Sequence, residues 1–132
     1  MTKTRLLFML CIVAAAITTS SFMPNTIRSN DDGLIRWHKT THDFGAVLFN
    51  RTVETEFRFT NVSGHPVVIT RVVPSCGCTV PEFDQMPILP GREGTIKTNF
   101  KGDSRGRFNK KITVLMDVGT YELFVTGQVV DP

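Results

Sequence analysis

Two cysteines separated by one glycine, Cys76 and Cys78 in the stretch PSCGCTVP, are the residues whose type and spacing most clearly suggest chemistry. Two thiols this close could form a disulfide, act as a redox pair or supply two ligands to a soft metal ion. In an extended strand the Cα atoms of residues i and i+2 lie about 6.6 Å apart, which is near the upper limit for a disulfide. A bridge therefore requires a bend, which Gly77 could supply because glycine tolerates positive φ.

A disulfide between Cys76 and Cys78 would add little stability. In the chain-entropy model, closing so short a loop contributes about 1.6 kcal/mol before any strain is subtracted. A strained bridge also tends to be the labile, more oxidising kind. If the cysteines are bonded, we therefore expect the bridge to be redox-active or incidental rather than structural.

Metal binding and simple packing are the other two alternatives. Two thiolates supply half of a tetrahedral zinc site, and the thioether of Met86 could add a soft ligand for Cu(I). The imidazoles are all distant in the sequence: His38, His42 and His65. In the plainer interpretation, both cysteines are small buried side chains and Gly77 serves the backbone. The sequence leaves these alternatives open and predicts no cofactor.

The first 22 residues have the pattern of a secretory signal peptide. Lys3 and Arg5 form a basic head, and residues 6–17 form an uncharged apolar run that is too short to span a bilayer. Leu10 stands before Cys11, where a lipoprotein signal needs a small residue, so we expect no lipid anchor. The sequence thus predicts an exported protein, periplasmic or secreted, with no integral membrane segment after cleavage.

Removing the leader changes the charge and the cysteine count. Without Lys3 and Arg5, the 15 basic residues become 13 against 12 acidic ones, so the net charge falls from +3 to +1. This balance argues against a nucleic-acid partner. Cys11 is also lost, which leaves one cysteine pair and excludes a disulfide-stapled scaffold.

The remaining chain is predicted to hold one domain. Residues 23–33 are polar and read as a flexible lead-in, and residues 34–132 alternate apolar and polar side chains as strands do. About seven strands are predicted, at 34–40, 46–49, 52–61, 67–73, 94–100, 108–117 and 121–130. Pro90 and Gly91 suit a type II turn before the fifth of these. The fold class is therefore all-β, a single immunoglobulin-like sandwich. The predicted core includes Phe57, Phe59, Ile69, Ile96, Phe100, Ile112, Val114, Leu123 and Val125.

The order of the motifs resembles one protein family. The segments HDFGAV, EFRFTNVSGHPVVITRVVPSCGCTVPE, PILPGREGTIKTNF, GRFNKKITV and LFVTGQV are similar to those of the secreted bacterial domain-of-unknown-function family fifteen-seventy-three. Members are common in Bacteroidetes and are similar to the immunoglobulin-like domains of the Hydin and ASPM group. The resemblance covers residues 35–130 and implies a fold, an exported location and a bacterial origin. It implies no activity and no catalytic residues, and it departs at Asp117, where the family pattern has Asn.

Four basic residues lie close together near a predicted hairpin: Arg105, Arg107, Lys110 and Lys111. They could meet an anionic partner such as a glycan or a lipid headgroup. Because Phe108 is the only aromatic residue among them and is needed inside, a solvated loop and edge strand is the plainer interpretation.

No catalytic motif is predicted. The DFG at 43–45 lacks the other kinase motifs, so Phe44 is expected to pack and Gly45 to turn. His42 and Asp43 are adjacent in a strand and should point to opposite faces. The NVS at 61–63 fits a glycosylation sequon, which in a bacterial protein we interpret as a turn.

The sequence therefore favours an exported, non-enzymatic binding module of the bacterial envelope. Its partner would be a protein or an envelope glycan, met through loops or an exposed strand edge. The alternative is a thiol-redox or soft-metal protein that uses Cys76 and Cys78.

Overall fold

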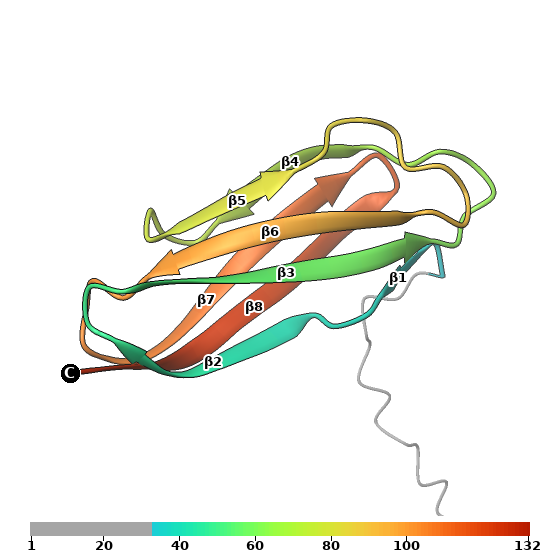
Figure 1. Cartoon of the computed structure of the whole chain (residues 1–132). Coiled ribbons are helices and arrows are strands. Elements are labelled where there is room, and N and C mark those ends of the chain that lie inside the picture. The colour runs from blue at the N-terminus through green and yellow to red at the C-terminus, as the bar shows by residue number, and fades with distance from the viewer. Residues whose placement is uncertain (1–32) are drawn as a thin grey trace, which may run out of the picture.

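Two four-stranded sheets pack face to face in the computed structural model, which describes residues 33–132 (Figure 1). The first sheet has the order β1–β3–β6–β5, with bounds β1 (Ile35–Trp37), β3 (Thr52–Asn61), β6 (Glu93–Lys101) and β5 (Thr79–Phe83). The second has the order β2–β8–β7–β4, with bounds β2 (Thr41–Leu48), β8 (Gly119–Val130), β7 (Gly106–Met116) and β4 (Ile69–Pro74). The predicted leader and nearly all of the lead-in lie outside the described residues.

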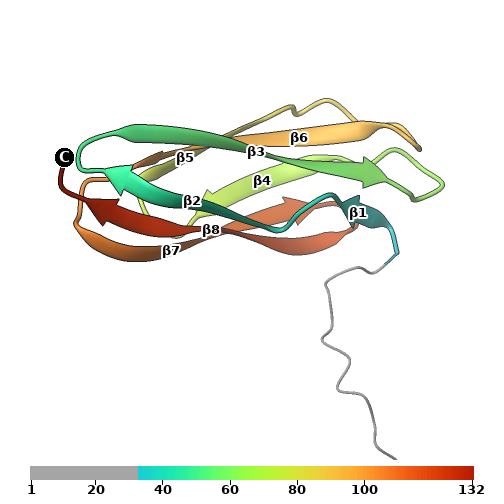
Figure 2. The same cartoon turned by 60° about the horizontal axis from the view of Figure 1, so that its bottom comes forward.

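Strand pairing is antiparallel except between β2 and β8, which run parallel. Figure 2 shows the two layers, with β3, β5 and β6 in one and β2, β7 and β8 in the other. Within residues 33–132 no helix is long and apolar enough to cross a membrane. The all-β sandwich predicted from the sequence is confirmed.

The core lies between the sheets because β3, β6, β7 and β8 bury alternate side chains along much of their length. All nine predicted core residues are buried, with at most 3% of their surface exposed. Trp37, whose side was not predicted, packs against this core, with its ring centroid 4.9 Å from that of Phe59 and 5.8 Å from that of Tyr121.

The structure has eight strands rather than about seven, because β5 was not predicted. Its sequence is only TVPEF, and Pro81 argues against a strand unless the strand lies at a sheet edge. β5 is such an edge strand.

The turn expected at Gly45 is a β-bulge inside β2. Gly45 has φ +65°, and the pairing of β2 with β8 shifts between Asp43 and Ala46. A bulge inserts an unpaired residue into a strand, and glycine supplies its positive φ without strain. Phe44 packs against the core in part, as expected.

The type II turn predicted at Pro90 and Gly91 is confirmed. The Arg92 amide donates to the Leu89 carbonyl at 3.0 Å and Gly91 has φ +76°, as a type II turn with Pro90 at its second position requires. In the β7–β8 turn, Asp117 accepts from the Val68 amide through Oδ1 at 3.0 Å, which is a contact with the segment before β4 rather than within the turn.

Asn61 joins two loops from inside the protein. Its side chain is fully buried, and Nδ2 donates to the carbonyls of His65 and Ile88, both at 2.8 Å. Oδ1 accepts from the Ser63 amide at 2.9 Å and from the Ser63 hydroxyl at 2.6 Å. Both polar atoms of this asparagine side chain, the one in the apparent sequon, are therefore engaged in hydrogen bonds inside the protein.

We predict that Asn61→Ala destabilises the protein by about 3 kcal/mol or more, because it leaves several buried groups without partners. Urea denaturation would measure the change in the free energy of unfolding. Asn99→Ala, on the solvent side of β6, is the matched control and should change it by less than about 0.5 kcal/mol. Equal effects of the two substitutions would contradict the role of the Asn61 hydrogen bonds.

Gly94→Ala should also destabilise, by about 1–3 kcal/mol. A Cβ at this position would meet the ring of Phe59, which is fully buried and paired directly opposite Gly94. Gly64→Ala is the control, because its Cβ would meet nothing within 4 Å and its φ is not positive. Thermal and urea melts of both variants test this, and an unchanged Gly94→Ala midpoint would show that the ring moves aside.

Candidate functional site

Cys76 and Cys78 form a disulfide in the turn between β4 and β5. Their Cα atoms are 5.3 Å apart, shorter than an extended strand allows, and the Thr79 amide points back to the Cys76 carbonyl at 3.4 Å. The bend that was expected is present. It does not use a positive φ at Gly77, so that part of the expectation is wrong.

The disulfide turn connects the two sheets on the side where β4 and β5 are the edge strands. It leads from β4, an edge strand of the second sheet, to β5, an edge strand of the first. On the β4 side, the Ser75 amide donates to the Lys111 carbonyl at 2.8 Å, and the Ser75 hydroxyl accepts from the Lys111 amide at 3.1 Å. On the β5 side, the Cys78 carbonyl accepts from the Lys101 amide at 3.0 Å. Backbone hydrogen bonds thus hold both ends of the turn independently of the bridge.

Both cysteines are half-buried rather than enclosed, so they are not the fully buried packing residues of the plainest interpretation. Cys76 Sγ lies 3.7 Å from the Thr79 hydroxyl. The reactivity of the pair remains a prediction. In residues 33–132, no group of three or more His, Cys, Asp or Glu side chains is placed to hold a metal ion.

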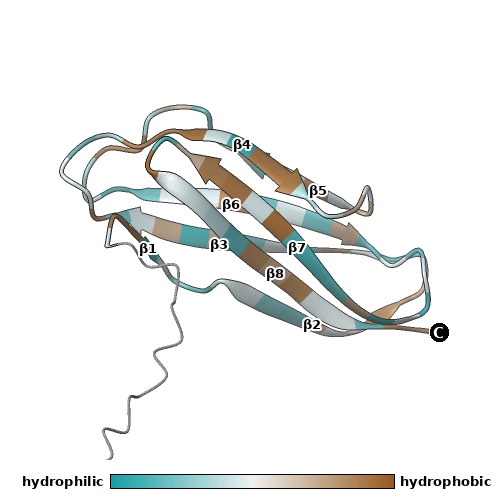
Figure 3. Ribbon diagram, turned by 180° about the vertical axis from the view of Figure 1, so that it is seen from behind, coloured by the Kyte–Doolittle hydropathy of each residue, from teal (hydrophilic) through white to brown (hydrophobic). Residues whose placement is uncertain are grey.

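Exposed apolar side chains are concentrated in the segment that contains the disulfide turn. Of the five large apolar side chains exposed in the described part of the chain, four lie between residues 73 and 89. They are Val73 (37% exposed), Val80 (56%), Met86 (69%) and Leu89 (54%). We call residues 73–89 the edge surface. Figure 1 shows β4, β5 and the β5–β6 loop together along the upper side of the sandwich, and in Figure 3 β4 carries both hydrophobic and hydrophilic residues.

The loop of the edge surface is held in place by backbone pairing. Val67 and Ile88 exchange hydrogen bonds of 2.9 and 2.7 Å, and the Met86 amide donates to Asp84 Oδ1 at 2.8 Å. The exposed Met86 and Leu89 therefore project from an ordered backbone.

Every sheet edge carries a feature that opposes the addition of a further strand. β1 has three residues, β2 has its bulge at Gly45, β4 has a register shift near Thr70 and ends at Pro74, and β5 contains Pro81. Short edges, bulges and prolines protect sheets from edge-to-edge pairing. Of the two contact modes expected from the sequence, the structure favours side-chain contact over strand addition.

The four basic residues do not form one patch. Arg105 pairs with Asp131 at 2.6 Å and stacks over the Phe49 ring at 4.0 Å, and Lys111 pairs with Glu122 at 2.8 Å. The other two lie on opposite sides of β7. Arg107 is on the solvent face, whereas Lys110 is on the side that carries the buried residues of the strand.

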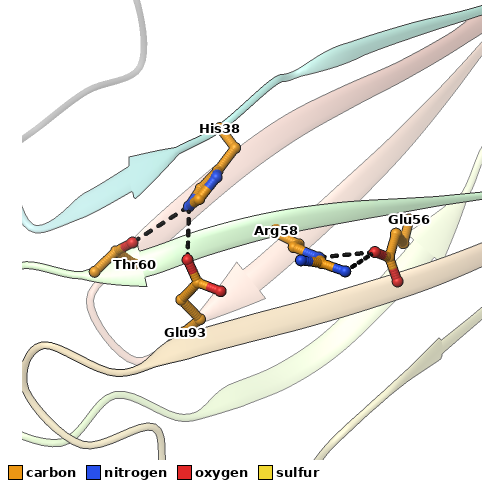
Figure 4. Close-up of polar contacts among 5 residues, drawn as sticks. All are labelled: His38, Glu56, Arg58, Thr60 and Glu93. Carbon is orange, nitrogen blue, oxygen red and sulfur yellow. Dashed lines mark hydrogen bonds and ion pairs between the residues drawn. The ribbon is translucent and has the colours of Figure 1, made fainter.

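Two separate sets of polar contacts lie on the outer side of the first sheet (Figure 4). His38 Nε2 lies 3.1 Å from Glu93 Oε1 and 3.4 Å from the Thr60 hydroxyl, and Arg58 pairs with Glu56. Only the Arg58 and Glu56 pair had a signal, because residues two apart in a strand share a face. Since His38 and Glu93 are both about half exposed, their pair contributes little to stability.

His42 contacts Lys39 rather than Asp43. Its Nδ1 is 3.1 Å from Lys39 Nζ, and its ring meets the edge of Phe44 at 4.6 Å. Burial lowers the pKa of His42 below its ordinary value, the Lys39 charge lowers it further, and Asp43 opposes the shift. Asp43 instead accepts the Gly45 amide at 2.8 Å through Oδ1. His42 and Asp43 therefore contact different partners, and no acid–base pair forms between them.

The outer face of the second sheet carries an open groove of about 700 Å³. It crosses β2, β8 and β7, and its lining is Asp43, Gly45, Ala46, Arg107, Phe108, Asn109, Thr126, Gly127 and Gln128. The sequence did not reveal this site, because β2 is far from the β7–β8 hairpin along the chain.

Solved structures share this fold. A protein of unknown function from Porphyromonas gingivalis W83 matches with a TM-score of 0.64 at 14% identity, over 72% of this chain and 46% of that chain. The ASH/PapD-like domain 7 of human CEP192 gives 0.64 at 10% identity, over 75% and 87%. The secreted serine protease VesC from Vibrio cholerae gives 0.60 at 10% identity, over 77% and 24%. This chain thus spans about half of the first protein, and at these identities the matches show the fold alone. PapD belongs to the immunoglobulin-like sandwiches, so the predicted fold class holds.

No protein of curated function matches the sequence. Residues 35–129 match the model of the family described as protein of unknown function (DUF1573). The chain belongs to this family, as its motifs predicted.

Proposed function

We propose that this protein is an exported, non-enzymatic interaction module of the bacterial envelope that binds a protein partner through its edge surface. The observation that carries the proposal is the concentration of exposed apolar side chains in residues 73–89. Scattered apolar residues are normal on protein surfaces, but a local group on an ordered segment is typical of a contact site.

The chemistry of the edge surface favours a protein over a glycan or a lipid. Its large exposed apolar side chains are aliphatic or thioether groups, and methionine adapts its shape to a partner. The only charged residues between 73 and 89 are Glu82 and Asp84, both exposed. The matching surface on the partner would therefore be apolar with basic residues at its rim.

The exported location rests on the N-terminal leader and on the cysteine pair. A bridge between Cys76 and Cys78 persists in an oxidising compartment such as the periplasm. The absence of a nucleophile motif from the sequence supports a binding role over catalysis. The similarity to the Hydin and ASPM group and the Bacteroidetes-type origin, both implied by the CGCT-containing motifs, agree with this proposal.

Charged substitutions in the edge surface should abolish partner capture. The double variant Met86→Lys, Leu89→Lys puts two cations where two exposed apolar side chains stand, and it should lose the protein that the wild type retains from an envelope extract of its own host. Leu48→Lys is the matched control, because within residues 33–132 Leu48 is the one exposed large apolar residue outside the edge surface. We expect this variant to retain the partner. Capture of the same protein by the double variant, or no capture by the wild type at any salt concentration, would sink the proposal.

A thiol-redox function is the second candidate, favoured by the half-exposed disulfide. Two-electron reduction by an external dithiol would break the S–S bond, take up two protons and leave two free thiols, while the dithiol becomes a disulfide. The hydrogen bonds of Ser75 and Cys78 to the neighbouring strands would remain, so the turn could cycle without unfolding the domain.

Replacing both cysteines by serine should cost at most about 1.6 kcal/mol of unfolding free energy, because the closed loop is so short. The same variant should lose all labelling by thiol reagents after mild reduction. Intact mass of the protein exported by its own host, purified without reductant or chelator, should show the loss of two hydrogens and no bound metal. A destabilisation of several kcal/mol, or a mass equal to the reduced chain, would instead make the pair structural.

A further inference from the structure

The groove on the second sheet is built from two rows of outward-facing side chains. In one row, Thr126 of β8 is the register partner of both Asp43 and Asn109. In the next row, Gln128 is the register partner of both Ala46 and Arg107. The rows are two residues apart, about 7 Å along the strands. The groove therefore presents five polar groups on three adjacent strands.

Two glycines shape the floor between these rows. Gly45 forms the bulge that shifts the register of β2. A Cβ at Gly127 would lie 2.7 Å from the Phe108 ring on its inner side and 2.8 Å from the Gly45 carbonyl oxygen. Because backbone and core occupy this space, the hollow is part of the folded sheet and does not depend on the movement of a loop. Its volume of about 700 Å³ lies within the range of ligand sites.

The polar groups of the groove have balanced charge and mixed hydrogen-bonding capacity. Arg107 supplies only donors, ionised Asp43 supplies only acceptors, and Asn109, Gln128 and Thr126 supply both. One cation and one anion sum to zero, so the groove has no net attraction for a polyanion or a polycation. The Gly45 amide orients the Asp43 carboxylate through Oδ1.

An aromatic residue lies next to the groove on β8, outside its lining. Phe124 lies two residues from Thr126 on the same outward side of β8, is half-buried and pairs in register with Thr41 and Lys111. It offers an apolar face beside the row of Asp43, Thr126 and Asn109. Ligand sites commonly combine such a face with a few directed polar groups.

We propose that this groove binds a neutral oligosaccharide. A chain of sugar rings carries adjacent hydroxyls that both donate and accept hydrogen bonds, which matches the amide, guanidinium, carboxylate and hydroxyl groups of the two rows. The apolar C–H face of a sugar ring packs on Phe124. This site is distinct from the edge surface, since it lies across β2, β8 and β7, whereas residues 73–89 belong to β4, β5 and the β5–β6 loop.

Amide NMR titration of the isotope-labelled exported chain tests the proposal. The probes are neutral hexaoses of glucose, mannose, xylose and N-acetylglucosamine, with hexagalacturonate as the anionic probe and a neutral polar peptide as the competing class. We expect at least one neutral hexaose to shift the amides of Asn109, Thr126 and Gln128 in a saturable way. Asn109→Ala and Gln128→Ala should each weaken that binding by about tenfold, which corresponds to one hydrogen bond of about 1.4 kcal/mol.

Asn99→Ala on the first sheet is the control and should bind as the wild type does. The amide spectrum of each variant shows whether it is folded, and Asn109→Asp, which keeps the side-chain shape, replaces Asn109→Ala if that variant unfolds. The proposal is overturned if no neutral hexaose shifts the groove amides, if binding survives both groove substitutions, or if only hexagalacturonate or the peptide binds there. Capture of a protein by the edge surface is independent of all these outcomes, so the two proposals fail separately.

Discussion

The ring of Phe108 lies across Gly127, and this contact joins the core of the protein to its outer surface. Phe108 belongs to the second sheet and stacks on Phe100 of the first with ring centroids 4.0 Å apart. The ring reaches this position only because Gly127, its register partner, has no side chain in the way. The same glycine also lets the Gly45 bulge approach β8. One small residue therefore permits both a contact between the sheets and the close approach of the Gly45 bulge.

The first sheet uses the same arrangement at its other end. Phe59 lies across Gly94, its partner on β6, and there it also packs on Trp37. In both cases an aromatic side chain covers a glycine on the neighbouring strand, which stabilises a position where glycine alone would weaken the sheet. These pairs fix the register of β3 with β6 and of β7 with β8, because a slip of one residue would put a Cβ into each ring.

The sequence predicts the core well and the surface sites poorly, for a physical reason. Burial of one strand face produces a period of two along the chain, so residues such as Phe57 and Ile112 are visible as core without knowledge of their partners. The groove has no such signal, because Asp43, Thr126 and Asn109 meet only through the pairing of three strands.

Two local features were also hidden from the sequence. The buried role of Asn61 depends on the Ile88 carbonyl from a distant loop, and NVS alone looks like a surface turn. The basic residues look like one cluster in the sequence, but the alternation of β7 separates Arg107 from Lys110, and carboxylates from elsewhere pair with Arg105 and Lys111.

The second sheet separates the two proposed contact surfaces by its strand order. β2 carries one wall of the groove and β4 begins the edge surface, and the two strands are the opposite edges of a four-stranded sheet. At about 4.8 Å between neighbouring strands, β2 and β4 are about 14 Å apart. A sugar chain lying across β2, β8 and β7 would leave Met86 and Leu89 accessible. β7 pairs with β4 and also lines the groove, and the Lys111 backbone of β7 hydrogen-bonds to Ser75 of the disulfide turn. This one strand therefore contacts both surfaces.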